Sequence, residues 1–302
     1  MHMLSSNEEL YNLIRPDLEN RLNLLKDKPE ESVESTFKAL GFAALGLHKS
    51  AEIAKKLTLP ELTKEQKNTL LELVNQRLGN MPLAYITGRQ NFMGIELLCD
   101  SRALIPRKET EILGKKALDL SLEIAKKKQV VKIIDVCCGA GNLSLAIANH
   151  NAKTYVSATD ISQEAIDLAQ ENIAFLNLGH RVSARQRDLL SAFETEEYLG
   201  KVDLIVCNPP YISSANVPKM NVEIAAHEPV LAFDGGAMGI NLILRLIREA
   251  PKFLTNPGWL IFEVGVGQGP FISRLCEKSE LYSQVESVSD DSGNIRVILA
   301  RT

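Results

Sequence analysis

The stretch VKIIDVCCGAGN, residues 131–142, decides the fold because an apolar run passes directly into a glycine-bearing loop. Val131 to Val136 predicts a buried strand, and the apolar spacing from Asn142 to Asn149 predicts a helix immediately after the loop. Gly139 and Gly141 allow a tight turn and a close approach of the backbone to a ligand at the helix N-terminus. This order of strand, loop and helix is typical of a ligand site in an open parallel sheet.

The rest of the chain after residue 105 continues the alternation of strands and helices. Further strands are expected at Thr154–Thr159, Arg181–Gln186, Val202–Cys207, Trp259–Val264, Gln284–Val288 and Arg296–Ala300, and further helices at Ser162–Leu176 and Gly239–Phe253. Helices between successive strands predict an α/β fold with a doubly wound, mostly parallel sheet of seven strands. The turn Asp290-Asp291-Ser292-Gly293 predicts that the last two strands are antiparallel at the sheet edge.

The chain before residue 105 has a different pattern. Residues 1–80 contain apolar side chains at steps of three and four, which predicts a small helical domain, and Thr63-x-x-Gln66 predicts a capping box within it. Residues 81–104 predict a linking β-hairpin, and residues 105–302 the catalytic domain. Pro106 is typical of the first turn of a helix, and the acids that follow suit its positive end. The helical domain is expected to recognise the substrate.

Composition disfavours several classes of function. A net charge of −4 and a pI near 5.8 disfavour a protein that binds nucleic acid through its phosphates. The five cysteines have neither disulfide nor zinc-ligand spacing, so no metal is expected. The N-terminus lacks the pattern of a signal peptide, and no apolar run is long enough to span a membrane. A cytoplasmic protein is therefore expected.

Two carboxylates follow the expected strands beside the glycine loop. Asp160 lies about 20 residues beyond the loop, where a carboxylate can hold the diol of a ribose. Asp188 follows the next strand and can accept the exocyclic amine of adenine, with Leu189 packing on the ring, although Asp188 is equally well explained as a turn or helix-cap acid. These features alone do not separate methyltransferases from nicotinamide enzymes. Ser144 stands where the dinucleotide fingerprint has its third glycine.

The stretch VDLIVCNPPY, residues 202–211, points to the reaction. Two prolines end the strand, so the Asn208 side chain and the Pro209 carbonyl are expected to project beyond its carboxyl end. An asparagine oxygen and a backbone carbonyl are two acceptors that can fix the plane of an NH2 group, and Tyr211 would add a flat wall. The motif therefore predicts methylation of a planar nitrogen.

The chain resembles the HemK-like glutamine N5-methyltransferases, whose best-known members modify the Gly-Gly-Gln glutamine of peptide chain release factors. The likeness runs from about Leu70 to Gln268. It is carried by Pro82 to Gly88, Phe92 to Gly94, Ile105 to Glu111, the glycine loop, Asn208 to Ile212, Glu228-Pro229, Phe233 to Gly236, Glu263 to Gly265, and Gln268. The order of these motifs is far more specific than any one of them.

The resemblance implies a class I methyltransferase fold, S-adenosyl-L-methionine as cofactor and a release factor as partner. It implies that the cofactor is bound by Cys137, Cys138, Gly139, Ala140, Gly141, Asp160, Asp188, Leu189 and Asn208. It also implies that the acceptor amide is held by Asn208, Pro209, Pro210 and Tyr211. The loop departs from the usual Gly-Thr-Gly pattern at Cys137, Cys138 and Ala140, and the segment before Leu70 matches only loosely, which puts the identity of the partner in doubt.

Three other functions are compatible with these residues. An exocyclic amine of a nucleic-acid base has the same planar geometry, although the base would have to leave its stack. A small metabolite with an amide or amine is a second acceptor. A regulatory protein that binds the cofactor without catalysis is the third, and the intact Asn-Pro-Pro-Tyr motif disfavours it.

Overall fold

A computed structural model describes residues 6–302, and the first five residues, part of the segment without a signal-peptide pattern, lie outside the described part. The described residues form two compact units. The first contains the residues up to Ser101 with Ile105–Lys108 and Asn221–Glu228. The second contains Arg102–Leu104, Glu109–Met220 and Pro229–Thr302.

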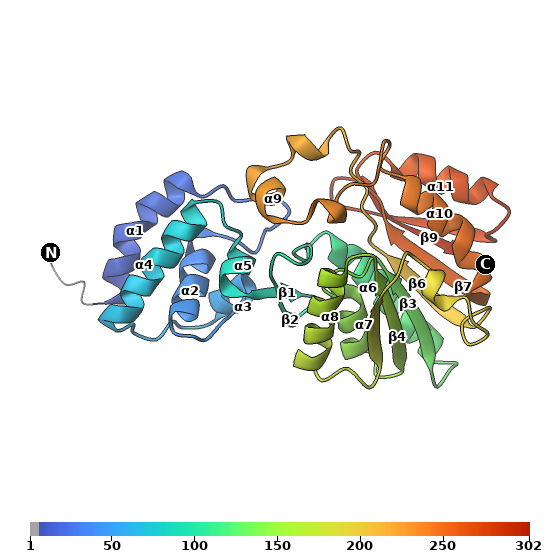
Figure 1. Ribbon diagram of the computed structural model, residues 1–302, viewed down its shortest axis with the longest axis horizontal. Helices are drawn as coiled ribbons and strands as arrows, with labels where there is room; N and C mark the ends of the chain where they lie inside the picture. Colours follow the sequence, from blue (N-terminus) through green and yellow to red (C-terminus); the bar gives the residue numbers. More distant parts are fainter. Residues whose placement is uncertain (1–5) are drawn as a thin grey trace. The chain divides into compact units, whose positions relative to one another are not determined.

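The first unit is mainly helical (Figure 1). Its elements are α1 (Asn7–Arg21), α2 (Val33–Ala44), α3 (Ala51–Lys56), α4 (Lys64–Leu78), α5 (Leu83–Thr87), β1 (Arg89–Phe92), β2 (Ile95–Leu98) and α9 (Val222–His227). Leu10, Leu18, Leu40 and Leu70 are fully buried in its core. The expected capping box begins α4, because Thr63 and Gln66 each accept a hydrogen bond from the other's backbone N–H, at 3.3 and 2.9 Å. The two strands form the expected antiparallel hairpin.

The second unit is built on a seven-stranded sheet with the order β5-β4-β3-β6-β7-β9-β8. Its strands are β3 (Val131–Val136), β4 (Thr154–Asp160), β5 (Val182–Gln186), β6 (Val202–Cys207), β7 (Leu254–Glu263), β8 (Gln284–Ser289) and β9 (Ile295–Arg301). Strands β3 to β7 are parallel, whereas β9 is antiparallel to both β7 and β8. The predicted doubly wound sheet and its antiparallel closing pair are confirmed.

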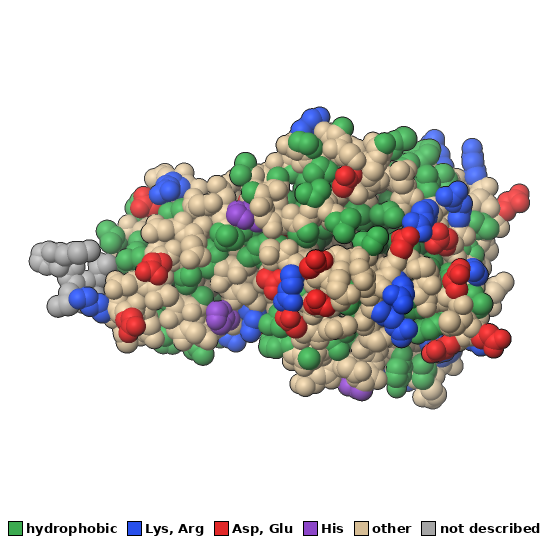
Figure 2. Space-filling model, viewed as in Figure 1, with side chains coloured by type: hydrophobic (Ala, Val, Ile, Leu, Met, Phe, Trp, Pro, Cys, Tyr) green, Lys and Arg blue, Asp and Glu red, His purple; other side chains and the backbone are tan. Residues whose placement is uncertain are grey.

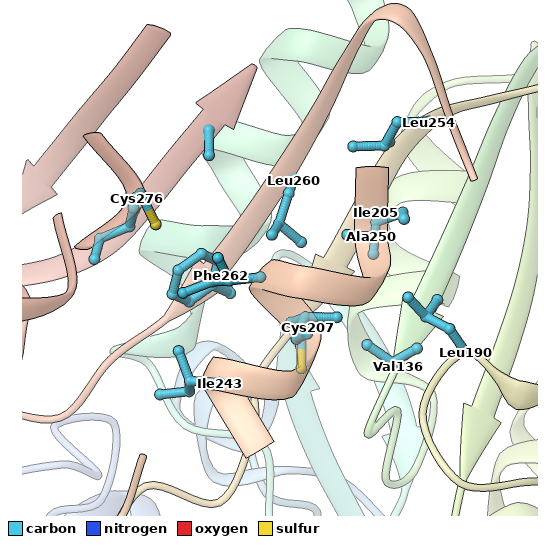
Figure 3. Close-up of a cluster of buried hydrophobic side chains, with 14 of the residues drawn as sticks. Val136, Leu190, Ile205, Cys207, Ile243, Ala250, Leu254, Leu260, Phe262 and Cys276 are labelled. Carbon is cyan, nitrogen blue, oxygen red and sulfur yellow. The ribbon is translucent and has the colours of Figure 1, made fainter. Parts of the chain in front are cut away.

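Helices cover both faces of this sheet (Figure 1). They are α6 (Thr110–Ala125), α7 (Asn142–His150), α8 (Gln163–Phe175), α10 (Asn241–Glu249) and α11 (Gly269–Lys278), with short 3₁₀ turns at Ser191–Phe193, Val217–Lys219, Val230–Ala232 and Ala250–Lys252. Figure 3 shows how Ile243 of α10 and Cys276 of α11 pack against Cys207 and Phe262 of the central strands. This cluster buries the middle of the sheet and makes the strand ends a rigid frame.

The beginning of α6 differs from the expectation. Pro106 does not start the helix, because Ile105–Lys108 belongs to the first unit and α6 begins at Thr110, with Glu109 as its N-cap. Buried polar contacts tie this short segment to Glu228 instead. The Ile105 N–H donates to Glu228 at 3.0 Å, and Arg107 donates to the same carboxylate at 2.5 Å. The start of α6 therefore places Thr110, four residues after Pro106, at the helix N-terminus.

The strand order fixes where a ligand can bind. Sheet neighbours run outward from β3 to β4 and β5 on one side, and from β6 to β7 on the other. The switch between these directions lies between β3 and β6, whose carboxyl ends carry the glycine loop and Asn208. Open α/β sheets bind ligands in the crevice at such a point.

Candidate active site

The glycine loop folds as a sharp turn between β3 and α7. Cys137, Gly139 and Gly141 have φ angles of 58°, 53° and 81°, in the left-handed region that glycine adopts without cost. A Cβ built on Gly139 meets no atom within 4 Å, so the surface of the loop is open there. The loop backbone can therefore approach a ligand closely, as the sequence predicts.

Asp160 at the end of β4 braces the loop. Its Oδ2 accepts the Gly139 N–H at 2.9 Å, and its Oδ1 accepts the Ser162 N–H at 3.0 Å. Burial raises the pKa of Asp160, and the hydrogen bonds from the backbone of Ser162 and Gly139 oppose that rise. The carboxylate thus joins the carboxyl ends of β3 and β4, with further lone pairs left on each oxygen.

Asp188 and Leu189 lie beyond the end of β5. The Asp188 carboxylate forms a partly exposed ion pair with Arg245 of α10, with Nη2 to Oδ2 at 3.0 Å. Leu189 is buried and has a φ of 44°, and its carbonyl accepts the Thr159 hydroxyl at 2.8 Å. Both residues therefore lie in a turn that is hydrogen-bonded to β4, the strand that carries Asp160.

Asn208 follows β6 directly and has one end of its amide bound. Its Nδ2 donates to the Thr110 hydroxyl at 3.1 Å. Its Oδ1 is buried and has no hydrogen-bond partner among residues 6–302. A buried acceptor without a donor costs free energy, on the order of 1–3 kcal/mol, unless a ligand satisfies it. The Asn208 amide thus offers a hydrogen-bond acceptor at the carboxyl end of β6.

The turn after Asn208 is held in place from behind. The Tyr211 hydroxyl donates to Glu263 Oε1 at 3.1 Å, and the Tyr211 carbonyl accepts from Gln268 Nε2 at 2.9 Å. A Cβ on Gly239 would lie 2.2 Å from the Tyr211 carbonyl oxygen, and one on Gly235 would lie 2.5 Å from that of Pro210. These two positions admit only glycine, so the chain from Gly235 to Gly239 packs directly on the turn.

Behind the turn, the buried Glu263 and Arg296 form a charged group with the exposed Glu109, which the sequence analysis did not place in the site. Arg296 donates to Glu109 at 2.8 Å and to Glu263 at 3.4 Å. Burial raises the pKa of Glu263, and the charge of Arg296 opposes that rise. Glu263 is the last residue of β7, and Asn208 directly follows the neighbouring strand β6. This shared position at the carboxyl ends of adjacent strands is the signal that would have found Glu263.

Two relatives match most of the chain. A release factor glutamine methyltransferase from Bradyrhizobium diazoefficiens is 34% identical over 281 residues, which cover 92% of this chain and 91% of the relative. One from Bacillus cereus is 32% identical over 240 residues, which cover 80% of this chain and 83% of the relative. The methyltransferase small domain family matches residues 114–227.

The chain belongs to the release factor glutamine methyltransferase family. Solved structures agree on the class I methyltransferase fold. The catalytic domain of hMettl16 in complex with MAT2A 3'UTR hairpin 6 superposes with a TM-score of 0.52 at 14% identity, over 76% of this chain and 91% of that one. Human methyltransferase 10 domain containing protein superposes with a TM-score of 0.50 at 17% identity, over 69% and 88%. These two likenesses concern the fold alone.

The cysteines of the methyltransferase's loop are apolar in their behaviour. Cys138 and Cys207 are buried, and burial raises the pKa of both thiols, so neither forms a thiolate near neutral pH. Cys138 in the loop and Cys207 at the end of β6 therefore act as small buried hydrophobic side chains, and the half-buried Cys137 packs against the same core as Cys207.

The surface of the methyltransferase carries charges of both signs. On the face drawn in Figure 2, acidic and basic side chains are interspersed. Within residues 6–302, the helices all fall short of the length and apolar character that crossing a bilayer requires.

Proposed function

We propose that this chain transfers a methyl group from S-adenosyl-L-methionine to the side-chain amide nitrogen of a glutamine in a peptide chain release factor. The glutamine would be that of the Gly-Gly-Gln motif. The observation that carries the proposal is the Asn208 amide, which holds a buried and unsatisfied acceptor at the end of β6. The family to which the chain belongs supports the choice of a glutamine amide as the partner of that acceptor.

The cofactor would occupy the carboxyl ends of β3, β4 and β5. The open surface at Gly139 suits a bulky ligand near the α7 N-terminus, and Cys137, Cys138, Ala140 and Gly141 complete that turn. In this proposal the remaining lone pairs of Asp160 accept from ribose hydroxyls, while Asp188 and Leu189 contact the adenine. Bound there, the cofactor supplies a methyl group made electrophilic by a sulfonium.

Asn208 and its neighbours would hold the acceptor. The Asn208 Oδ1 and the Pro209 carbonyl accept the two amide protons of the glutamine, while Pro210 and Tyr211 hold the plane of the group. With the cofactor bound, the amide nitrogen would take the methyl group from the sulfonium, whose sulfur would keep the electron pair of the carbon–sulfur bond, and one amide proton would leave to water. Hydrogen bonds to the amide protons raise the electron density on nitrogen, and fixing the nitrogen in line lowers the barrier further.

The first unit would select the partner. A pocket that reads only an amide cannot distinguish one glutamine from another, so selectivity requires contacts outside the reacting group. We assign these contacts to the helical residues 1–80 and the hairpin 81–104, leaving the chemistry to the domain of residues 105–302. The mixed surface charge supports a protein partner over a nucleic acid bound through its phosphates. A release factor as substrate would place the enzyme in the cytoplasm.

The test is methylation of a purified release factor from the same source, mapped by peptide mass spectrometry. The proposal expects one added methyl group on the glutamine of Gly-Gly-Gln, and none on a release factor in which that glutamine is replaced by asparagine. Oligonucleotides carrying adenine or guanine serve as rival substrates. A methyl group found on a base, or on a different residue of the release factor, contradicts the proposal.

A further inference from the structure

The shape of the Asn208 side chain does not determine which end of its amide faces the substrate. The two ends of the side chain have nearly the same shape, so either the oxygen or the NH2 group can face the substrate. Only one orientation serves an acceptor that is itself an NH2 group, because the other sets donors against donors. Something outside Asn208 must therefore distinguish the two orientations.

The Thr110 hydroxyl is the group in contact with the far end of this amide. Thr110 is the first residue of α6 and is 2% exposed. It accepts from Asn208 Nδ2 at 3.1 Å, which leaves Oδ1 on the opposite side. A hydroxyl has one proton and two lone pairs, so its preference between the two ends of the amide depends on where its proton goes.

Glu263 is the hydrogen-bond acceptor for the Thr110 proton. Burial raises the pKa of Glu263, while the cation of Arg296, 3.4 Å away, and the hydrogen bond with Thr110 oppose that rise and favour the charged carboxylate. Because Asn208 Nδ2 donates to the Thr110 oxygen, the single Thr110 proton is left for Glu263, whose carboxylate oxygens accept it. The Tyr211 hydroxyl also donates to Glu263, at 3.1 Å. These hydrogen bonds therefore run in one direction: Asn208 donates to Thr110, and Thr110 donates to Glu263.

We propose that Thr110 and Glu263 are positioning residues that hold the Asn208 amide with its oxygen toward the methyl acceptor. The inference rests on the proposed function only for the identity of that acceptor. Thr110 acts through Asn208, and Glu263 acts through Thr110. Arg296, held by Glu109 at 2.8 Å, opposes the effect of burial and favours the charged form of Glu263.

Two substitutions of Thr110 separate positioning from packing. Thr110→Val keeps the shape and removes the hydroxyl, whereas Thr110→Ser keeps the hydroxyl and removes a methyl group. Positioning predicts that Val lowers the single-turnover rate about tenfold or more and that Ser restores most of it, with the cofactor Kd unchanged in both. A packing role predicts the reverse order. Thr154→Val removes another fully buried hydroxyl at the opposite end of β4, bonded to Asn151 at 2.9 Å, and is the matched control with a normal rate.

A second readout requires no methyl acceptor. In protein labelled with ¹⁵N at asparagine, the side-chain NH2 signals of Asn208 are assigned by their loss in Asn208→Ala. We expect slow proton exchange of this NH2 group in the wild type and in Thr110→Ser, and faster exchange in Thr110→Val and Glu263→Gln. If release factors are not methylated, the proposed function fails while the exchange data still test the positioning. Unchanged exchange in Thr110→Val, or a larger loss of rate in Ser than in Val, overturns the inference.

Discussion

Asp135, the fifth residue of β3, is fully buried, and its second oxygen has no hydrogen-bond partner within residues 6–302. Burial raises its pKa to about 7, although the hydroxyl and N–H of Ser144 donate to its Oδ2 at 2.6 and 3.1 Å. The folded state therefore keeps a proton that the unfolded state releases near pH 4. This difference makes the stability of the domain depend on pH in a defined direction.

Because the folded pKa of Asp135 is the higher one, its contribution to stability is full below about pH 4 and is lost as pH rises to about 7. Asp135→Asn cannot ionise and lacks this loss. The free energy of unfolding of the wild type minus that of the variant should fall by about 1.4 kcal/mol per pH unit between about pH 5 and pH 7. Urea unfolding of both proteins measures it, and a constant or rising difference would sink the assignment.

Asp160 gives a second prediction, on cofactor affinity. Asp160→Asn keeps one acceptor oxygen for the backbone but loses the charge and an acceptor for the ribose. The cofactor Kd should rise about tenfold to a hundredfold, since a charge-assisted hydrogen bond contributes roughly 1.5–3 kcal/mol. Calorimetry with S-adenosyl-L-methionine checks this. A Kd equal to that of the wild type removes Asp160 from the cofactor site.

Helix α9 is bound within the first unit by charges that are almost completely buried. Glu223 accepts from Lys28 at 2.6 Å and from Arg77 at 2.7 Å, and Arg77 also donates to Glu31 at 2.8 Å. Burial acts to raise the pKa of Glu223, but the two cations outweigh it and lower the pKa below its usual range. The two cations balance the two carboxylates.

Arg77→Met should destabilise the protein by about 3–5 kcal/mol, because it leaves two buried carboxylates with one cation. The double variant Arg77→Met with Glu31→Gln should recover part of the loss, since one unpaired charge is removed. Arg15→Met breaks an exposed pair with Glu19 and is the control, with little change expected. Denaturant unfolding compares them. An Arg77→Met protein as stable as the Arg15→Met control would contradict this account of the network.

The elements that the sequence predicts well are those with a local signal. The apolar runs of β3 and β6 end at glycines and prolines, and their bounds match the expected Val131–Val136 and Val202–Cys207. The place of α9 had no such signal, because Lys28 and Glu223 are 195 residues apart. Arg296 was equally hidden, since it lies near the start of β9 and reaches Glu263 only through the antiparallel pairing of β7 and β9.

At the scale of the molecule, the order of chain segments matters for any experiment on the two units. The chain contributes Asn221–Glu228 to the first unit, starting ten residues after Tyr211, and then returns to the second. Deleting residues 1–80 would remove Lys28 and Arg77 and leave Glu223 buried or newly exposed as an unpaired charge. The proposed role of the first unit in partner selection is therefore better tested with exposed residues of the full chain.

The central claim is that Asn208 presents an acceptor to the glutamine amide of a release factor. The most direct measurement is the single-turnover rate of methylation by Asn208→Ala, with cofactor and release factor both saturating and with folding checked by thermal unfolding. We expect the folded variant to lose roughly a hundredfold or more in rate, because orientation and stabilisation of the reacting amide fail together. A folded Asn208→Ala enzyme that methylates the glutamine at the wild-type rate would contradict the account.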